Sequence, residues 1–312
     1  MFRLAHVTDP HFRGFDGTRI ATLANKRAIG LVNLALNRRR KHKAELLEAL
    51  VADLRAQPVD HLALTGDLSN VSLEGEWREA LRWLSSYGAP AEAVTVIPGN
   101  HDAYVTDVVQ GGTFEKLFAA FQTRDDVGVA GAFPEPAPTG GAGDGSRAPY
   151  PFLRLRGPLA IVAVNSCVPT GDLGAWGEVG EAQLRRLEAL LTSPDVAHRV
   201  RVVLIHHPPV MLKGGESRNL RDRAALVAVL ARAGADLVLH GHDHRDESAI
   251  LEGPAGRAIP VIGAGSASYK GGPDTRARYN IYELAGDAIT LVTRVHDEAT
   301  DAFKETRREK LG

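Results

Sequence analysis

Five short polar motifs are the most informative feature of this 312-residue sequence. Together they supply carboxylate, amide and imidazole side chains, which are ligands that divalent metal ions accept in proteins. Each motif follows a short apolar run that is typical of a buried β-strand. The motifs are Asp9-Pro10-His11, Gly66-Asp67, Gly99-Asn100-His101-Asp102, His206-His207-Pro208-Pro209 and Gly241-His242-Asp243-His244. This set contains enough ligands for two metal ions.

The first two motifs contribute two carboxylates and one imidazole. Asp9 and His11 are two positions apart at a predicted strand end, and strand geometry, if it persists to that end, places both side chains on one face. Asp67 follows Gly66, which allows a tight turn and a close approach of a metal ion. Because a carboxylate has two oxygens, we predict that Asp67 bridges two cations. Taken alone, either motif is also consistent with a capping residue or a plain turn.

The motif that begins at Gly99 is the most specific of the five. Asn100 can offer its amide oxygen to a hard cation. We predict that His101 meets the substrate and does not bind metal, and that Asp102 fixes the tautomer of the His101 ring and raises its basicity. The alternative is a helix N-cap followed by ordinary polar residues.

The remaining ligands are histidines at the ends of two later strands. His206 continues a strand directly and is predicted to bind metal, whereas its neighbour His207 faces the other way and is predicted to support the ligands or contact substrate. His242 and His244 are again two positions apart, and each can serve a different metal ion. His240 is predicted to be a packed histidine at a strand end. The histidines without a motif are predicted to be structural or solvated: His6, His42, His61, His198 and His296.

Composition and charge indicate an ordinary globular chain. Hydrophobic residues make up 44% of it and charged residues 24%. The formal net charge of -1 produces no overall positive electrostatic potential that would attract nucleic acid. Cys167 is the single cysteine, which excludes an intramolecular disulfide and a thiolate zinc site. Residues 1–7 are too short and too soon polar for a signal peptide, and no apolar run approaches the length of a membrane span. We therefore expect a cytoplasmic protein.

Short apolar runs alternate with helical patterns along the chain, which is typical of an α/β protein. In such folds ligands collect beyond the carboxyl ends of the strands, where every motif lies. Residues 131–151 are rich in Gly, Pro and Ala and are expected to form a flexible loop within one domain that spans residues 1–312. Strands are predicted at 2–7, 61–65, 93–97, 158–164, 200–205, 236–239, 258–262, 278–284 and 289–295, and helices at 43–57, 74–87, 181–191 and 222–233.

In this order and spelling, the motifs resemble those of the calcineurin-like metallophosphoesterases, over residues 2 to about 250. The resemblance implies a four-layer α-β-β-α sandwich of two mixed sheets flanked by helices, with a dinuclear metal centre at the strand ends. The spelling looks most like the branch of bacterial class III cyclic-nucleotide and glycerophosphodiester phosphodiesterases. The resemblance implies one cation held by Asp9, His11, Asp67 and His244, a second held by Asp67, Asn100, His206 and His242, and His101 acting on the leaving group.

A dinuclear centre of this kind predicts a metal-dependent phosphoric ester hydrolase, and a phosphodiesterase is the leading hypothesis. Two divalent ions roughly 3.5–4 Å apart can clamp a phosphoryl group, and a hydroxide that bridges them would attack phosphorus in line with the leaving oxygen. Mixed nitrogen and oxygen ligands suit Mn, Fe or Zn. The alternatives are a phosphomonoesterase, a nucleoside-diphosphate-lipid pyrophosphatase and, more remotely, a non-catalytic scaffold on the same fold.

Residues 12–43 form a basic insertion with interleaved apolar residues, which leaves directly from His11 and is expected to border the metal site. Three interpretations remain open: a helical lid with a solvated basic end, a lid that brings Arg or Lys to the substrate, and a segment that makes weak contact with an anionic membrane. We expect a small phosphorylated substrate rather than a nucleic acid, because only 6% of residues are aromatic. The candidate substrate contacts are Tyr104, Arg218 and Tyr269.

Overall fold

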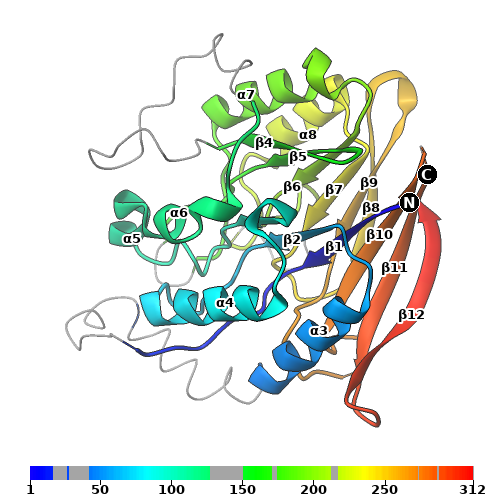
Figure 1. Cartoon of the computed structure of the whole chain (residues 1–312). Helices are drawn as coiled ribbons and strands as arrows, with labels where there is room; N and C mark the ends of the chain where they lie inside the picture. The colour runs from blue at the N-terminus through cyan, green and yellow to red at the C-terminus, as the bar shows by residue number, and fades with distance from the viewer. Residues whose placement is uncertain are drawn as a thin grey trace.

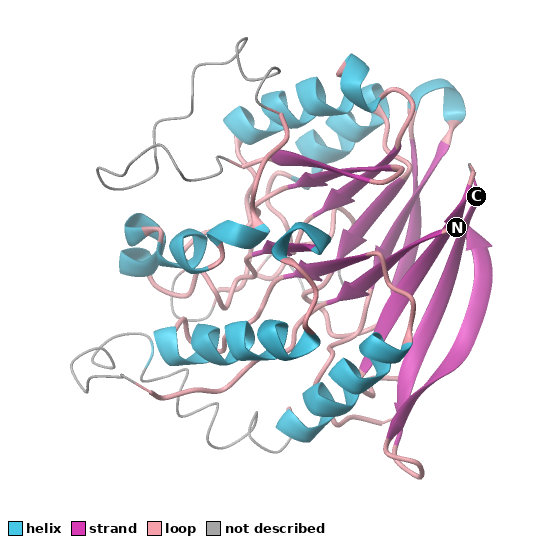
Figure 2. Ribbon diagram, viewed as in Figure 1, coloured by secondary structure: helices cyan, strands magenta, loops and turns pink. Residues whose placement is uncertain are grey.

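The computed structural model describes residues 1–16, 27, 42–126, 150–170, 174–211, 217–272, 274–286 and 288–311. Most of the insertion at 12–43 and of the loop at 131–151 therefore lies outside the described residues. Two six-stranded sheets pack face to face, and helices cover the outer face of each sheet (Figure 1, Figure 2). This is the four-layer α-β-β-α sandwich that the family resemblance implied.

The first sheet carries the first three motifs. Its order is β12-β11-β10-β1-β2-β3, in which β1, β2 and β3 are parallel to one another and the remaining pairs are antiparallel. The strands are β1 (Phe2–Val7), β2 (His61–Thr65), β3 (Val94–Ile97), β10 (Arg278–Ala285), β11 (Ala288–Asp297) and β12 (Ala302–Leu311).

The second sheet carries the two histidine motifs. Its order is β4-β5-β6-β7-β9-β8, with β5, β6, β7 and β9 parallel and the edge strands β4 and β8 antiparallel to their neighbours. The strands are β4 (Phe152–Arg156), β5 (Leu159–Ala163), β6 (Val200–Leu204), β7 (Leu237–His240), β8 (Glu247–Glu252) and β9 (Ala258–Gly263).

Within the described ranges, two longer helices cover each sheet and two short helices follow β3. The longer helices are α3 (Ala44–Ala56) and α4 (Glu74–Tyr87) on the first sheet, and α7 (Glu181–Leu191) and α8 (Arg223–Ala233) on the second. The short helices are α5 (Thr106–Gly111) and α6 (Thr113–Leu117). Single 3-10 turns occur at Ala91–Ala93, Ala119–Phe121, Pro194–Val196 and Pro254–Gly256. No helix in the part of the chain that the structure describes is long and apolar enough to cross a membrane.

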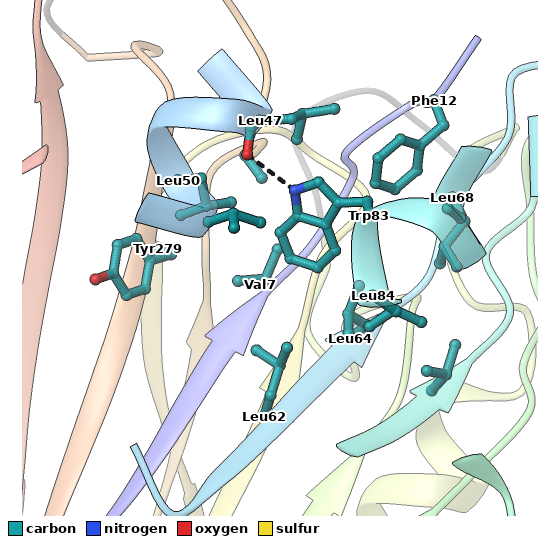
Figure 3. Close-up of a cluster of buried hydrophobic side chains, with 14 of the residues drawn as sticks. Val7, Phe12, Leu47, Leu50, Leu62, Leu64, Leu68, Trp83, Leu84 and Tyr279 are labelled. Atoms are coloured by element: carbon teal, nitrogen blue, oxygen red, sulfur yellow. Dashed lines mark hydrogen bonds between the residues drawn. The ribbon is translucent and has the colours of Figure 1, made fainter. Parts of the chain in front are cut away.

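Three hydrophobic layers hold the sandwich together. Alternate residues of β1 point to opposite sides, so that Val7 packs against the helices of the first sheet and Leu4 packs between the sheets. In the outer layer, the indole of Trp83 in α4 packs beside Phe12 and donates a hydrogen bond to the carbonyl of Leu47 in α3 (2.9 Å; Figure 3). A third layer joins the second sheet to α7 and α8. These layers fix the strand ends on which the motifs lie.

Candidate metal centre

The carboxyl ends of five strands, from both sheets, meet at one edge of the sandwich. The motif residues follow β1, β2, β3, β6 and β7, and backbone hydrogen bonds tie these ends together. The amide of Asp9 donates to the carbonyl of Gly66 (3.1 Å), and the amide of His11 donates to the carbonyl of Asp67 (3.1 Å). This meeting brings His11 next to His244, which lies 233 positions away in the sequence.

The ligand side chains converge because the backbone turns at each of these positions. Asp9 and His11 have φ angles of 51° and 47°, in the left-handed region. Asp67 has a φ of 53°, and His242 and His244 have values of 78° and 55°. The two side chains of the first motif do meet, but strand geometry does not persist to them, because β1 ends before Asp9.

Two glycines make room for the carboxylates. A Cβ atom on Gly99 would lie 2.2 Å from Oδ1 of Asp67, and a Cβ atom on Gly241 would lie 2.5 Å from Oδ2 of Asp9. Both distances are far below van der Waals contact. These positions therefore require glycine so that each carboxylate can turn inward.

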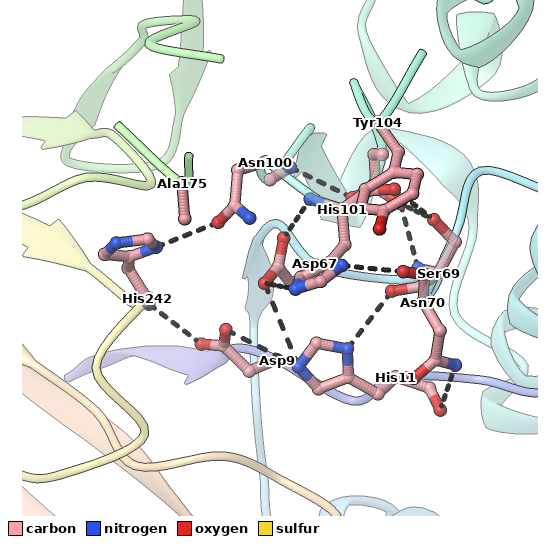
Figure 4. A network of polar contacts seen from close by, with 12 residues as sticks. Asp9, His11, Asp67, Ser69, Asn70, Asn100, His101, Tyr104, Ala175 and His242 are labelled. Atoms are coloured by element: carbon pink, nitrogen blue, oxygen red, sulfur yellow. Dashed lines mark hydrogen bonds and ion pairs between the residues drawn. The ribbon is translucent and has the colours of Figure 1, made fainter. Parts of the chain in front are cut away.

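Asp9, His11, Asp67 and His244 form a first cluster, in which the donor atoms all lie within 4.8 Å of one another. Nε2 of His11 is 3.1 Å from Nε2 of His244, and Nε2 of His244 is 3.2 Å from Oδ1 of Asp9. The Nδ1 atom of His11 donates to the carbonyl of Ser69 (3.1 Å), so its Nε2 atom carries a lone pair toward the cluster (Figure 4).

Asn100, His206 and His242 form a second cluster. Nδ1 of His206 donates to the carbonyl of Thr65 (2.8 Å), and Nε2 of His242 donates to the carbonyl of Arg218 (3.0 Å). The other nitrogen of each ring therefore carries a lone pair. These two nitrogens lie 3.1 Å and 2.9 Å from Oδ1 of Asn100. Three acceptor atoms thus face one another.

Asp67 lies between the two clusters. Its Oδ2 atom is 3.8 Å from Nε2 of His11, and its Oδ1 atom is 3.5 Å from Nε2 of His206. One carboxylate therefore presents one oxygen to each cluster, which is the geometry expected of a bridging ligand.

The electrostatics of both clusters fit divalent cations. Burial lowers the pKa values of His206 and His242, which keeps both rings neutral. Burial raises the pKa of Asp9, but His244, His206 and the Thr8 hydroxyl together outweigh that effect and the net pKa is lowered, so the carboxylate is ionised. Inward-facing lone pairs and carboxylate charge repel one another unless a cation lies between them. The nitrogen and oxygen donors suit Mn, Fe or Zn.

His101 is oriented by a backbone carbonyl. Its Nδ1 atom donates to the carbonyl of Asn70 (2.6 Å). The prediction that Asp102 orients His101 is wrong, because the Asp102 carboxylate is used elsewhere: it accepts hydrogen bonds from the amides of Ser69 (2.9 Å) and Gly99 (2.9 Å). Asp102 also accepts from the amide of Leu68, the hydroxyl of Ser69 and the indole of Trp77. Asp102 therefore ties the loop after β2 to the turn after β3.

The Nε2 atom of His101 faces the cluster edge. It lies 4.0 Å from Oδ2 of Asp67, and the His101 amide donates to Oδ1 of the same carboxylate (2.8 Å). The side chain is 15% exposed, whereas the side chains of His11 and His206 are fully buried. His101 is therefore placed where a substrate could reach it.

The three candidate substrate contacts all lie near the site. The ring of Tyr104 stacks on His101 with 5.8 Å between centroids. The guanidinium of Arg218 lies 3.3 Å from the Asp243 carboxylate, and the ring of Tyr269 lies 6.2 Å from that of His244.

His207 packs against a ligand histidine and is held by hydrogen bonds to neighbouring residues. Its Nδ1 atom is 2.8 Å from the hydroxyl of Ser166, and its Nε2 atom donates to the carbonyl of Ala175 (3.1 Å). Its ring packs 4.4 Å from the ring of His242. Of its two predicted roles, these contacts favour support of the ligands over contact with substrate.

His42 was predicted to be structural or solvated, but it lies beside the first cluster. Its side chain is buried, and its ring centroid is 4.6 Å from that of His11 and 5.6 Å from that of His244. A lone histidine at the end of a basic run gives no local signal of this position. The other histidines follow their predictions: His6, His61, His240 and His296 are buried, and His198 is exposed.

Comparison with known proteins identifies the class. A family model described as calcineurin-like phosphoesterase matches residues 2–246. A cAMP/cGMP dual specificity phosphodiesterase of Mycobacterium tuberculosis is 26% identical over 270 residues, which cover 85% of this chain and 67% of that protein. The chain therefore belongs to the calcineurin-like phosphoesterase family of metal-binding hydrolases.

Solved structures share the fold. A dimetal phosphatase from Danio rerio has a TM-score of 0.58 at 14% identity, and the match covers 99% of this chain and 98% of that one. A purple acid phosphatase from yellow lupin seeds has a TM-score of 0.59 at 12% identity, covering 99% of this chain and 53% of that one.

Proposed function

We propose that this protein is a phosphodiesterase that uses two divalent metal ions. The proposal rests on one observation: the first and second clusters of ligand side chains, whose lone pairs face inward, share the Asp67 carboxylate. Each ligand histidine with a described carbonyl partner has its tautomer set by that backbone group, so the nitrogen that faces the cluster is an acceptor. When bound, two such cations supply Lewis acidity, lowering the pKa of coordinated water and neutralising phosphoryl oxygens.

His101 would assist departure of the leaving group. As an imidazolium it would keep donating Nδ1–H to the carbonyl of Asn70 and would present Nε2–H to the leaving oxygen. The ring stacks on Tyr104, which limits its rotation. The contribution should be large for an alkoxide, which leaves poorly, and small for p-nitrophenolate, which needs little protonation.

Two observations support a diester over a monoester. The M. tuberculosis relative is named as a cyclic-nucleotide phosphodiesterase. In addition, a monoester carries a second negative charge near neutral pH, and Arg218, the described cation on the rim of the second cluster, is already paired with Asp243 at 3.3 Å. That pairing reduces the positive charge available to a second anionic oxygen, so a singly charged diester suits the site better.

A metal-supplemented substrate screen tests the proposal. The full chain, stripped with chelator and reloaded with Mn²⁺, Zn²⁺ or Fe²⁺, would be assayed with bis(p-nitrophenyl) phosphate, p-nitrophenyl phosphate, cyclic nucleotides, glycerophosphodiesters and a UDP-linked lipid pyrophosphate. We expect kcat/KM for diesters to exceed that for monoesters. A preference for the monoester or for the pyrophosphate would refute the proposal in favour of a phosphomonoesterase or a pyrophosphatase. If no substrate is hydrolysed with any metal, the non-catalytic scaffold would be the remaining hypothesis.

Two variants assign the roles. Asp67→Asn should lower kcat/KM at least about 100-fold and reduce metal content, because it weakens a ligand shared by both clusters. His101→Asn should lower kcat by about 10²–10⁴-fold for an alkyl leaving group and much less for p-nitrophenolate. The control is His198→Asn, on the exposed surface. Equal losses for both leaving groups would contradict the role given to His101.

A further inference from the structure

His42 reaches the metal centre from a segment outside the five motifs. It stands at the end of the basic insertion, just before α3, and the residue is 4% exposed. Its ring meets those of His11 and His244 edge-on, with interplanar angles of 65° and 87°. One ring nitrogen of each of the three histidines lies within 4.8 Å of the other two. The cluster is thus a set of three imidazoles on one side of the first cation site.

Side-chain and backbone contacts fix the His42 ring. Its Nδ1 atom lies 2.8 Å from the hydroxyl of Ser268, and its backbone pairs with that of Tyr269 in an isolated β-bridge. The amide of Lys43 donates to the carbonyl of Ser268 (3.0 Å), and the guanidinium of Arg13 donates to the carbonyl of His42. The residue is therefore held from both sides.

The loop that holds His42 is itself joined to the first motif. The hydroxyl of Ser266 donates to the carbonyl of Asp9 (2.7 Å), and the amide of Ala267 donates to the carbonyl of Thr8 (3.0 Å). Because the same loop positions Asp9 and the Ser268 partner of His42, the distance between His42 and the first cluster is set by the fold.

We propose that His42 is an additional ligand of the cation held by Asp9, His11, Asp67 and His244. This inference rests on the metal centre of the proposed function, but not on its preference for diesters. The Ser268 hydroxyl can donate or accept a hydrogen bond; in the tautomer in which Nδ1 of His42 donates to it, Nε2 carries the lone pair that a cation requires. Two nitrogens on one cation at about 2.1 Å can be no more than about 4.2 Å apart. The His42 nitrogen lies within 4.8 Å of the nitrogens of His11 and His244 but is not within that distance of both carboxylates of the first cluster, so the ring must move toward the cation to bind it.

The additional imidazole has a consequence for the metal. It gives the first cation three nitrogen and two oxygen donors from the protein. Imidazole suits transition-metal ions, whereas Mg²⁺ and Ca²⁺ prefer oxygen ligands. The first position should therefore take Mn²⁺, Fe²⁺ or Zn²⁺ and reject Mg²⁺.

The test compares two buried histidines that each contact a hydroxyl at 2.8 Å. His42 contacts Ser268, and His61, at the start of β2 and far from the strand ends that carry the site, uses Nε2 to contact Thr95. His42→Asn keeps an amide in the place of Nδ1 and removes Nε2, whereas His61→Gln keeps an amide in the place of Nε2. Mn²⁺ binding to the full-length apoprotein would be followed by the electron paramagnetic resonance signal of free Mn²⁺, and folding by circular dichroism.

We expect wild type and His61→Gln to bind two equivalents of Mn²⁺, each with the same affinity in both proteins. We expect His42→Asn to stay folded and to bind one of the two equivalents at least about tenfold more weakly than wild type does. Two unchanged affinities in folded His42→Asn would overturn the inference and leave the proposed function intact. Equal weakening of both equivalents would also overturn it, because a ligand of one cation should act mainly on that cation. If wild type binds no Mn²⁺, Zn²⁺ or Fe²⁺, the metal centre itself is refuted.

Discussion

Glu76 is expected to control His101 through the loop after β2, and replacing it with glutamine tests this connection. The Glu76 side chain, in α4, is fully buried. Its Oε1 atom accepts a hydrogen bond from the amide of Asn70 (3.1 Å), and its Oε2 atom accepts from the amides of Val71 (3.1 Å) and Leu73 (3.0 Å). The carbonyl of Asn70 in turn accepts the Nδ1 proton of His101. Glu76 is thus a positioning residue for His101.

In Glu76→Gln, an NH₂ group replaces one carboxylate oxygen and faces backbone N–H groups. Each buried donor that loses its acceptor costs about 1–3 kcal/mol, so two lost acceptor contacts predict destabilisation by about 2–6 kcal/mol. At about 2–4 °C per kcal/mol, Tm should fall by about 4–24 °C. The measurement belongs at pH 8.5, because burial raises the pKa of Glu76 to about 7 and the wild-type carboxyl must be ionised. The control is Glu74→Gln on the same helix, where the carboxylate is 54% exposed and pairs with Arg78, with an expected effect below about 0.5 kcal/mol.

The activity of Glu76→Gln separates positioning from a general loss of structure. If the loop holds His101, kcat should fall more for a diester with an alkyl leaving group than for bis(p-nitrophenyl) phosphate. An unfolding free energy as little changed as that of Glu74→Gln would refute the account of the loop. An equal fall in kcat for both leaving groups would refute its link to His101.

Three further predictions concern stability, packing and the insertion. Burial lowers the pKa values of His6 and His61 to about 3, so on acidification the unfolded chain takes up these protons before the folded chain does. The free energy of unfolding should therefore fall below about pH 6, by about 1.4 kcal/mol per histidine per pH unit. A free energy of unfolding in urea that does not change from pH 7 to pH 4 would contradict this. Gly99→Ala should displace Asp67, destabilise the fold by at least about 1–3 kcal/mol and lower metal content, measured by circular dichroism and elemental analysis. For residues 12–43, neutralising the basic side chains should reduce sedimentation with anionic liposomes if the segment contacts membranes, whereas unchanged sedimentation would reject that interpretation.

The buried strands could be predicted from the sequence because their apolar runs are short and sit between turn residues. The predicted strands at 2–7 and 61–65 have the bounds of β1 and β2, and the predicted helix at 181–191 has the bounds of α7. The edge strands β4, β8 and β12 were missed. In β12 most residues are charged or polar and exposed, so no apolar run marks the strand. Such strands form because a neighbouring strand offers hydrogen bonds, and their own residues carry little signal.

The motif residues could be found from type and spacing, but the contacts that orient them could not. Asn70 orients His101 through a backbone carbonyl, which any residue type could supply. Asp102 was assigned to His101 because the two are adjacent, yet its carboxylate serves the loop after β2. His42 and Ser268 are separated by 226 positions, and only the folded chain brings them together.

The left-handed backbone at the ligand positions argues that the sheets impose the shape of the centre. Eight described residues other than glycine have positive φ, and five of them are Asp9, His11, Asp67, His242 and His244. Each such conformation costs free energy and persists only where the surroundings over-determine it. Here the surroundings are strand-end hydrogen bonds, which do not require a cation. The backbone at the ligand positions is therefore set by folding, whereas the repulsion among the lone pairs and carboxylates of the two clusters is relieved when cations bind.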